Sequence, residues 1–353
     1  MGRAAVERIA VNWYGARRSR RFNSMVLFLG AALFAHSAET NTAKPTVIVM
    51  AGAAGEEDFG KVFVQAAESW QRAAEKARVN FVGIGMTNST ATNDLARFHA
   101  AMDKESKDGS AELWIVLLGH GTFDGKEAKF NLHGPDLSAS SLSNLLIGFH
   151  RPVAIINTAS SSSPFIKALS RTNRVIATAT RSGSEENYAR FGRFISQAIG
   201  ETEADLDKDG QTSLLEAFLM ASRRVTEFYK SEGRLATEHA LLDDNGDGLG
   251  TPADWFRGIH AFKKAANNAP LDGMRAHQWH LIRSSQDQKL SAEQRKERDS
   301  LELQIGKLRE QKSSMSEDEY YRKLEQLLTK LADIEFSGES QSKQPSAPAS
   351  PLR

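Results

Sequence analysis

Oxygen-bearing side chains recur at a regular spacing between residues 205 and 216. Calcium-binding loops of twelve residues carry ligands at positions 1, 3, 5, 7, 9 and 12, with a glycine at position 6 where the chain turns sharply. In this first loop the acidic ligand positions are filled by Asp205, Asp207, Asp209 and Glu216, and the glycine is Gly210. The spacing therefore predicts a calcium ion held by hard oxygen ligands.

The two remaining ligand positions and the flanks of the first loop also fit. Gln211, at position 7, would use its backbone carbonyl, and Ser213, at position 9, would act through a water molecule. Apolar residues at helical spacing predict one helix over residues 188–204 and another over residues 213–229. This helix–loop–helix arrangement resembles the EF-hand. The alternative is an acidic turn between two helices that holds no ion.

A second loop, residues 243–254, repeats the pattern with two departures. Gly248 stands at position 6, and the ligand positions carry Asp243, Asn245, Asp247, Thr251 and Asp254. The aspartate at position 12 is shorter than the usual glutamate, and the glycine at position 8 lacks the apolar side chain that pairs two such loops. We therefore expect a weaker site, and an ordinary Asp/Asn/Gly turn explains the stretch almost as well. Together the two loops define a calcium-binding region over residues 188–258.

Composition limits the kinds of partner and of chemistry. The 353 residues are 40% hydrophobic and carry a formal net charge of +1, which suits one large or two smaller domains. So balanced a charge does not indicate a nucleic-acid partner. Cysteine is absent, which excludes disulfides, thiolate metal sites and cysteine nucleophiles.

Residues 1–38 have the pattern of a targeting segment. Four arginines lie between residues 17 and 21, an apolar run covers residues 25–35, and small residues follow at Ser37 and Ala38. The run is too short to span a membrane comfortably, so we expect a removed signal peptide and no stable membrane span. The protein would then be exported to the periplasm or the extracellular space, where calcium is abundant enough to fill even weak loops.

Short apolar runs alternate with helical patterns over residues 45–200. This alternation indicates an α/β fold with a parallel sheet and helices on both faces. The predicted strands are residues 46–51, 79–84, 113–118, 153–156 and 175–180, and the predicted helices are residues 57–77, 95–102 and 142–146. Ligands of such sheets bind beyond the carboxyl ends of the strands.

Polar residues follow three of these predicted strands. His120 lies between two glycines after the third strand, residues 157–163 form a hydroxyl-rich run after the fourth, and residues 178–185 form a polar loop after the fifth. A histidine and a serine from neighbouring strand ends can form a base and nucleophile pair. The alternative is that the hydroxyls satisfy backbone groups and that His120 faces solvent.

These strand ends resemble the caspase-like fold of the legumain (C13) and caspase cysteine peptidases, in which His-Gly follows the third strand and the catalytic cysteine follows the fourth. His120-Gly121 matches the first element, and Asn157-Thr158-Ala159 stands where legumain-like enzymes have Glu-Ala-Cys. The resemblance implies that His120 is the general base and that Gly121 lends its backbone N–H to an oxyanion hole. It places Ala159 at the position of the nucleophile, or Ser160 if the alignment is shifted by one residue.

The missing thiol leaves three functions open. The first is an exported calcium-binding homologue of these peptidases that is not catalytic and binds a peptide or protein. The second is an active serine-dependent hydrolase that pairs His120 with Ser160 or Ser161. The third is a structural module of an envelope assembly, held by its C-terminal helices.

The C-terminal third is predicted to be mainly helical. Residues 255–266 continue as a helix after the second loop. Residues 270–336 contain a charged helical hairpin, whose two helices start at the capping residues Ser291 and Ser316. Residues 337–353 are rich in Ser, Pro, Gln and Lys and are expected to be disordered.

Overall fold

The computed structural model describes residues 44–86, 93–267 and 269–341, without the side chains of residues 337–341. All of these residues belong to one compact unit, Thr42–Arg353. The predicted signal peptide, residues 1–38, lies outside the described residues, as does the predicted tail beyond residue 341. In the described part of the chain, no helix is long and apolar enough to cross a membrane.

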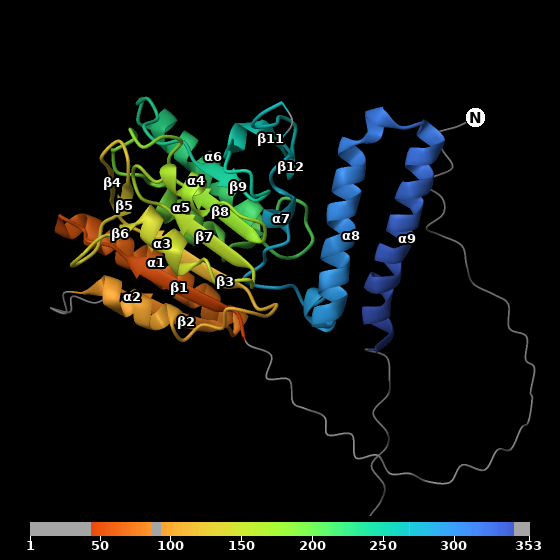
Figure 1. Ribbon diagram of the computed structural model, residues 1–353, viewed down its shortest axis with the longest axis horizontal. Coiled ribbons are helices and arrows are strands. Elements are labelled where there is room, and N and C mark those ends of the chain that lie inside the picture. The colour runs from red at the N-terminus through yellow and green to blue at the C-terminus, as the bar shows by residue number, and fades with distance from the viewer. Residues whose placement is uncertain (1–43, 87–92, 268, 342–353) are drawn as a thin grey trace, which may run out of the picture. The chain divides into compact units, whose positions relative to one another are not determined.

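A seven-stranded sheet forms the centre of the fold, in the order β10-β9-β8-β7-β3-β1-β2 (Figure 1). Its five parallel strands are β1 (Thr46–Ala51), β2 (Asn80–Ile84), β3 (Leu113–Leu118), β7 (Val153–Asn157) and β8 (Arg174–Thr178). Every residue of β1 and β3 is buried, because both faces of these inner strands are covered. The predicted fold class is confirmed, and the five predicted strands are present with ends that differ by one or two residues.

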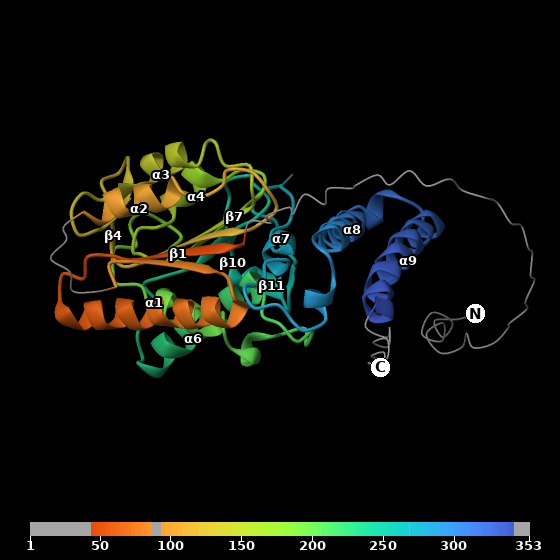
Figure 2. The same ribbon diagram turned by 90° about the horizontal axis from the view of Figure 1, so that it is seen from below.

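Helices cover both faces of the sheet (Figure 2). One face packs against α1 (Glu57–Ala77), α5 (Phe191–Ala198) and α6 (Leu214–Ser231), with Trp70, Trp114 and Phe218 in the core. The other face carries α2 (Asp94–Met102), α3 (Ala139–Leu145) and α4 (Pro164–Leu169), with Phe98, Phe130 and Phe165 in the core. Helix α3 begins before the predicted residue 142, because the Ser138 hydroxyl caps it by accepting a hydrogen bond from the Ser141 amide at 3.1 Å.

The first loop lies between α5 and α6, but the helix before it is shorter than predicted. Helix α5 ends at Ala198, and a separate 3-10 helix, η1 (Thr202–Ala204), leads into the loop. Gly200 stands at the break, in keeping with the low helix propensity of glycine. Helix α6 starts at Leu214, as the pattern predicts, and Ser213 is its N-cap.

Short strands outside the parallel sheet were not predicted. Strands β9 (Leu241–Asp243) and β10 (Thr251–Pro252) extend one edge of the main sheet in antiparallel fashion. A three-stranded sheet follows β3 and comprises β4 (Gly121–Phe123), β5 (Ala128–Phe130) and β6 (Leu137–Ser138).

The prediction of a helix over residues 255–266 is wrong. A 3-10 helix, η2 (Ala253–Trp255), precedes a two-stranded hairpin made of β11 (Phe256–Arg257) and β12 (His260–Ala261). Gly258 turns the chain there with a φ of 57°, a conformation that does not continue a helix. The Phe262 amide then donates to the Trp255 carbonyl at 2.9 Å, which closes the hairpin.

A helical hairpin ends the described chain. It follows α7 (Met274–His277) and η3 (Asp287–Lys289), and it consists of α8 (Ala292–Glu310), η4 (Lys312–Ser314) and α9 (Glu317–Gln341). Ser291 and Gln294 form a capping box at the start of α8. Leu301 and Ile334 pack between the two helices. Helix α9 includes residues 337–341, so the prediction of disorder is wrong for these residues.

Candidate calcium centre and strand-end residues

The first loop folds around the carboxylate of Asp205. Its Oδ1 atom accepts a hydrogen bond from the Lys208 amide at 2.6 Å, and its Oδ2 atom accepts one from the Gly210 amide at 3.1 Å. Both of these later residues have a positive φ, 65° for Lys208 and 88° for Gly210, which coils the loop tightly. The glycine at position 6 is therefore required by the turn, as the sequence pattern indicates.

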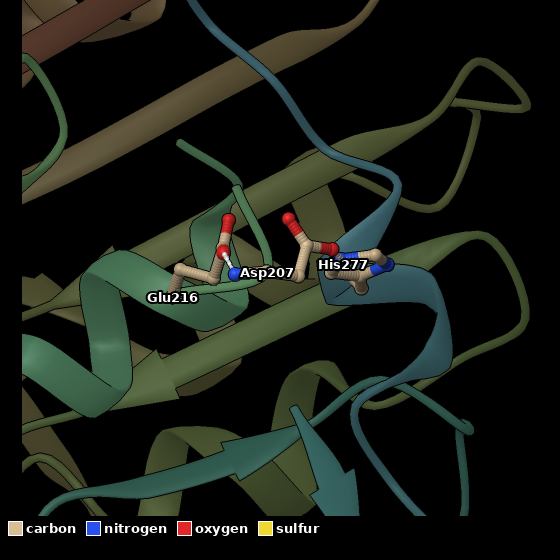
Figure 3. A group of neighbouring side chains, drawn as sticks. All are labelled: Asp207, Glu216 and His277. Atoms are coloured by element: carbon tan, nitrogen blue, oxygen red, sulfur yellow. Dashed lines mark hydrogen bonds and ion pairs between the residues drawn. The ribbon is translucent and has the colours of Figure 1, made fainter. Parts of the chain in front are cut away.

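The carboxylate of Glu216, at position 12, closes the first loop through hydrogen bonds to its backbone and to Ser213. Its Oε1 atom accepts hydrogen bonds from the amides of Leu206 at 2.7 Å and Asp207 at 3.3 Å. Its Oε2 atom accepts from the amide and the hydroxyl of Ser213, both at 2.8 Å. Figure 3 shows the Asp207 carboxylate between Glu216 and the ring of His277. Glu216 is fully buried and held in place by the loop that it closes.

The predicted acidic ligands of the first loop converge. Oxygen atoms of Asp205, Asp207 and Asp209 all lie within 4.8 Å of one another. Burial raises the pKa of Asp209, and the charges of the other two aspartates raise it further. The amide of Gln211, at position 7, donates to Asp209 Oδ1 at 3.0 Å. A divalent cation would neutralise the charge that this loop concentrates.

The second loop repeats the backbone pattern of the first. Asp243 accepts hydrogen bonds from the amides of Gly246 and Gly248, both at 3.1 Å, as Asp205 does from Lys208 and Gly210. Asn245 and Asp247, at positions 3 and 5, accept amides within the loop at 2.8 Å. The flanks differ, because strands β9 and β10 replace the two helices. The second loop is a strand–loop–strand unit and not the helix–loop–helix of an EF-hand.

Asp254 does not take the place expected for position 12 of the second loop. It is exposed on η2. Asp272 takes that place: its Oδ1 atom accepts from the amides of Asp244 at 3.0 Å and Asn245 at 3.3 Å, and its Oδ2 atom accepts from the Thr251 hydroxyl at 2.5 Å. These are loop positions 2, 3 and 9, the same positions that Glu216 binds in the first loop. Sequence reasoning missed Asp272 because it lies outside the twelve-residue window.

Buried acidic side chains gather behind the second loop. Asp244 and Asp272 are 2% and 3% exposed. Burial and the charge of Asp244 raise the pKa of Asp272 to about 9. Asp244 in turn accepts the amides of Gly273 and Ala276 at the start of α7, at 2.9 and 2.7 Å. A cation in the second loop would therefore meet a carboxylate that the protein already holds in place.

His120, the predicted general base, points into an aromatic cluster. Its ring lies 4.9 Å from the Phe59 ring, 5.3 Å from the Phe63 ring and 5.8 Å from the Tyr188 ring, measured between centroids. Burial lowers the pKa of His120, so the ring is held neutral. The described residues include no hydrogen bond between His120 and Ser160.

Ser160 and Gly121, the other two predicted catalytic residues, bind each other. The Gly121 amide donates to Ser160 Oγ at 3.2 Å, and that hydroxyl donates to the Gly121 carbonyl at 3.1 Å. Ser161 has a positive φ of 55°, and its hydroxyl is buried without a partner among the described groups. Ala159, at the position of the peptidase nucleophile, is 1% exposed. The structure brings the two strand ends together, as predicted, but the Ser160 hydroxyl binds the backbone of Gly121.

Little open space lies beside these strand ends. A cavity between α1 and the ends of β3 and β7, lined in part by Leu118, Thr158 and Gly192, has a volume of about 10 Å³. That volume holds about one water molecule. A larger cavity, of about 290 Å³, lies beside the first loop and includes Asp207, His277 and His280 in its wall.

No protein-family model and no curated protein sequence matches the chain. Solved structures with some similarity include the initiator caspase Dronc of Drosophila, with 12% identity, a TM-score of 0.36, and coverage of 66% of this chain and 92% of that one. Caspase-1 of Spodoptera frugiperda has 9% identity, a TM-score of 0.37, and coverage of 64% and 94%. A structural-genomics target protein of Geobacter sulfurreducens has 11% identity, a TM-score of 0.31, and coverage of 51% and 89%. Similarities at these TM-scores assign the chain to no family.

Proposed function

We propose that this chain is an exported calcium-binding protein with a caspase- and legumain-like arrangement of strand ends that binds a peptide or protein and does not catalyse hydrolysis. The observation that carries the proposal is the first loop. Three aspartates within 4.8 Å of one another and a buried glutamate at position 12 provide the oxygen set that calcium prefers. Export follows from the predicted signal segment, and it would expose the loops to abundant calcium.

In the second loop we propose Asp243, Asn245, Asp247 and Asp272 as the side-chain ligands. Asp272 replaces the Asp254 of the sequence pattern because it binds the amides of loop positions 2 and 3. Asp254 is exposed on η2. Calcium would thus tie the edge strands β9 and β10 to the segment that leads into α7. Binding of calcium to both loops would be linked to the folding stability of this edge of the protein.

A protein partner is supported by the surface of α9. Tyr321 and Leu328, which are 50% and 45% exposed, lie seven residues apart and so share one face of that helix. Phe336, further along the helix, is 66% exposed. Exposed aromatic and aliphatic side chains on one face are typical of protein contacts.

Calcium binding is tested by equilibrium dialysis of the full chain against calcium, after treatment with chelator. We expect two ions per chain, with the first loop tighter than the second. Dissociation constants for such loops run from about 10⁻⁸ to 10⁻³ M. No bound calcium at about 10 mM free ion, ten times that upper limit, would refute the proposal.

The absence of catalysis is tested with a mixed peptide library and the full chain, in calcium and in chelator, beside a His120→Ala variant. We expect no cleavage in any sample. The reason is that Ser160 Oγ is engaged with the Gly121 backbone and that His120 is packed among aromatic rings.

The second candidate function is a serine-dependent hydrolase. One observation favours it: Ser160 Oγ lies next to the Gly121 amide, which is the group that the resemblance names as an oxyanion donor. Such an enzyme would need His120 to leave the aromatic cluster and reach Ser160. Cleavage that is lost in both His120→Ala and Ser160→Ala would establish this function and overturn the non-catalytic one.

A further inference from the structure

The 290 Å³ cavity beside the first loop has a strongly acidic wall. Its charged lining consists of five carboxylates and one guanidinium, contributed by Asp207, Asp209, Asp287, Glu302, Glu335 and Arg298. The guanidinium is already paired, because it binds the carboxylates of Asp287 and Asp299. The lining of the cavity thus has more carboxyl groups than cations, and the cavity has room for a hydrated cation.

His280 is a buried polar side chain in this wall that has no partner. It is 6% exposed, and neither ring nitrogen makes a hydrogen bond with any described group. Buried polar atoms in folded proteins are normally satisfied, so a ring with two unsatisfied nitrogens indicates a missing ligand.

His277 stands beside His280 and already binds a carboxylate of the first loop. Its Nε2 atom lies 2.9 Å from Asp207 Oδ2. Ligand atoms of Asp207, Glu216 and His277 all fall within 4.8 Å of one another (Figure 3). The other oxygen of Asp207, Oδ1, accepts the Asp209 amide inside the loop at 3.2 Å. Asp207 therefore has one oxygen toward the calcium loop and one toward the histidine.

The two rings are close enough to share an ion. Their centroids lie 6.3 Å apart, with an angle of 71° between the ring planes. With a zinc–nitrogen bond of about 2.0–2.1 Å and a tetrahedral angle at the metal, the centroids of two ligating imidazoles lie about 5 Å apart. The two centroids are thus about 1 Å farther apart than those of two ligands on one metal, so binding of the ion would require the rings to move closer together.

We propose that this cavity holds a transition-metal ion of the Zn²⁺ class, bound by His277, His280 and Asp207. Imidazole nitrogens favour such metals over calcium, which takes oxygen ligands. Asp207 would bridge the two metals, with Oδ1 on the calcium side and Oδ2 on the zinc side. The second metal would thereby fix the position of one calcium ligand.

The backbone that carries the two histidines is held against the body of the fold. Trp279, between them, packs edge-on against Trp114 of β3 with ring centroids 5.0 Å apart. The Leu214 amide donates to the Trp279 carbonyl at 2.8 Å, and His280 forms a β-bridge with Ser213. A metal site benefits from such support, because ligands on a rigid backbone lose little freedom on binding.

The test uses the full chain, saturated with calcium, and titrates it with Zn²⁺ by calorimetry and with Co²⁺ by visible absorption. We expect one ion per chain and cobalt bands of a site with nitrogen ligands. Changing His280→Ala or His277→Ala should lower the Zn²⁺ affinity by more than about tenfold, since loss of an outer-shell partner alone costs that much. The matched control is His150→Ala, which removes a histidine that is exposed at the surface.

A fourth variant separates this proposal from the proposed calcium function. Asp205→Asn should weaken calcium binding at the first loop while the full chain still binds one Zn²⁺ ion, because Asp205 is not among the proposed Zn²⁺ ligands. If a histidine variant fails to fold, as judged by circular dichroism, the same measurement is made on His280→Gln. Equal Zn²⁺ affinity in the wild-type chain and in the His280 and His277 variants would overturn the proposal. So would a full chain that binds no Zn²⁺ at all.

Discussion

The two acidic loops have nearly the same pattern of ligand residues but differ in what surrounds them. The first lies between η1 and α6, and its closing carboxylate, Glu216, comes from within the twelve residues. The second lies between two edge strands, and the equivalent hydrogen bonds go to Asp272, which lies 18 residues beyond the end of the loop. The comparison shows that a local pattern can specify how a loop coils while the fold decides which carboxylate closes it.

The flanking structure explains this difference. In the first loop, position 12 falls in the first turn of α6, where the helix points Glu216 back at the loop and Ser213 forms a capping box with it. In the second loop, position 12 falls on η2, after β10, and Asp254 is exposed there. The vacant place is taken by Asp272, two residues before α7, and the start of that helix is bound to Asp244.

The largest effect is expected when calcium is removed from both loops at once. A ligand present at a hundred times its dissociation constant stabilises the folded state by about 2.7 kcal/mol per site. Chelator should therefore lower the melting temperature by several degrees, as measured by differential scanning calorimetry. An unchanged melting temperature would mean that neither loop holds calcium in the folded protein.

The second-largest effect is expected for a variant of the first loop. Glu216→Gln removes the charge at position 12 but keeps the shape of the side chain, and we expect calcium affinity to fall by about a hundredfold at this loop, or about 2.7 kcal/mol. The matched control is Glu227→Gln on the same helix, which removes an exposed carboxylate that binds only Arg223. Calcium titrations of the two variants that coincide would show that Glu216 acts only as a helix cap.

The comparison between the loops is sharpened by a pair of variants in the second loop. Asp272→Asn should weaken calcium binding there by about tenfold, and Asp254→Asn should leave it unchanged. The expected difference arises because only Asp272 contacts the loop backbone. The reverse result would show that Asp254, the residue predicted from spacing alone, is the calcium ligand. It would also mean that η2 rearranges when calcium binds.

The smallest expected effect is a change in stability with pH at His120, which follows β3. This region provides a contrast with the two acidic loops, because no metal is proposed there. Burial lowers the pKa of His120 from its ordinary value of 6.5. Protonation below pH 6.5 therefore favours the unfolded chain, so His120 contributes stability that is present above that pH and is lost as the pH falls below it. Because the residue is only partly buried, we expect this loss to be less than about 1 kcal/mol.

Two measurements check the prediction for His120. An NMR titration should place its pKa below 6.5, and His120→Phe should reduce the loss of stability in acid while leaving calcium affinity unchanged. A pKa above 6.5 would indicate a carboxylate partner and would favour a catalytic role for the ring.

Much of the fold could be read from local patterns because each pattern has one strong physical cause. The continuous apolar runs of β1 and β3 need burial on both faces, so they predict inner strands of a parallel sheet. The helix over residues 57–77 has its apolar side chains on one face, and α1 has those same bounds. The prediction of a helix over residues 255–266 failed because the turn at Gly258 and the pairing of a short hairpin outweighed the weak helical periodicity of this stretch.

The candidate sites also combine features that the local sequence determines with features that depend on the tertiary structure. The sequence by itself determined the coil of both acidic loops, because alternate aspartates and a glycine at position 6 act over a few residues. It also determined that His120 and Ser160 follow neighbouring strands. Only the tertiary structure decided that Asp272 closes the second loop and that His277 and His280 meet Asp207 across a cavity. It also packed the ring of His120 against Phe59. These contacts join residues far apart in the chain, and their formation depends on how buried side chains pack, which no local spacing records.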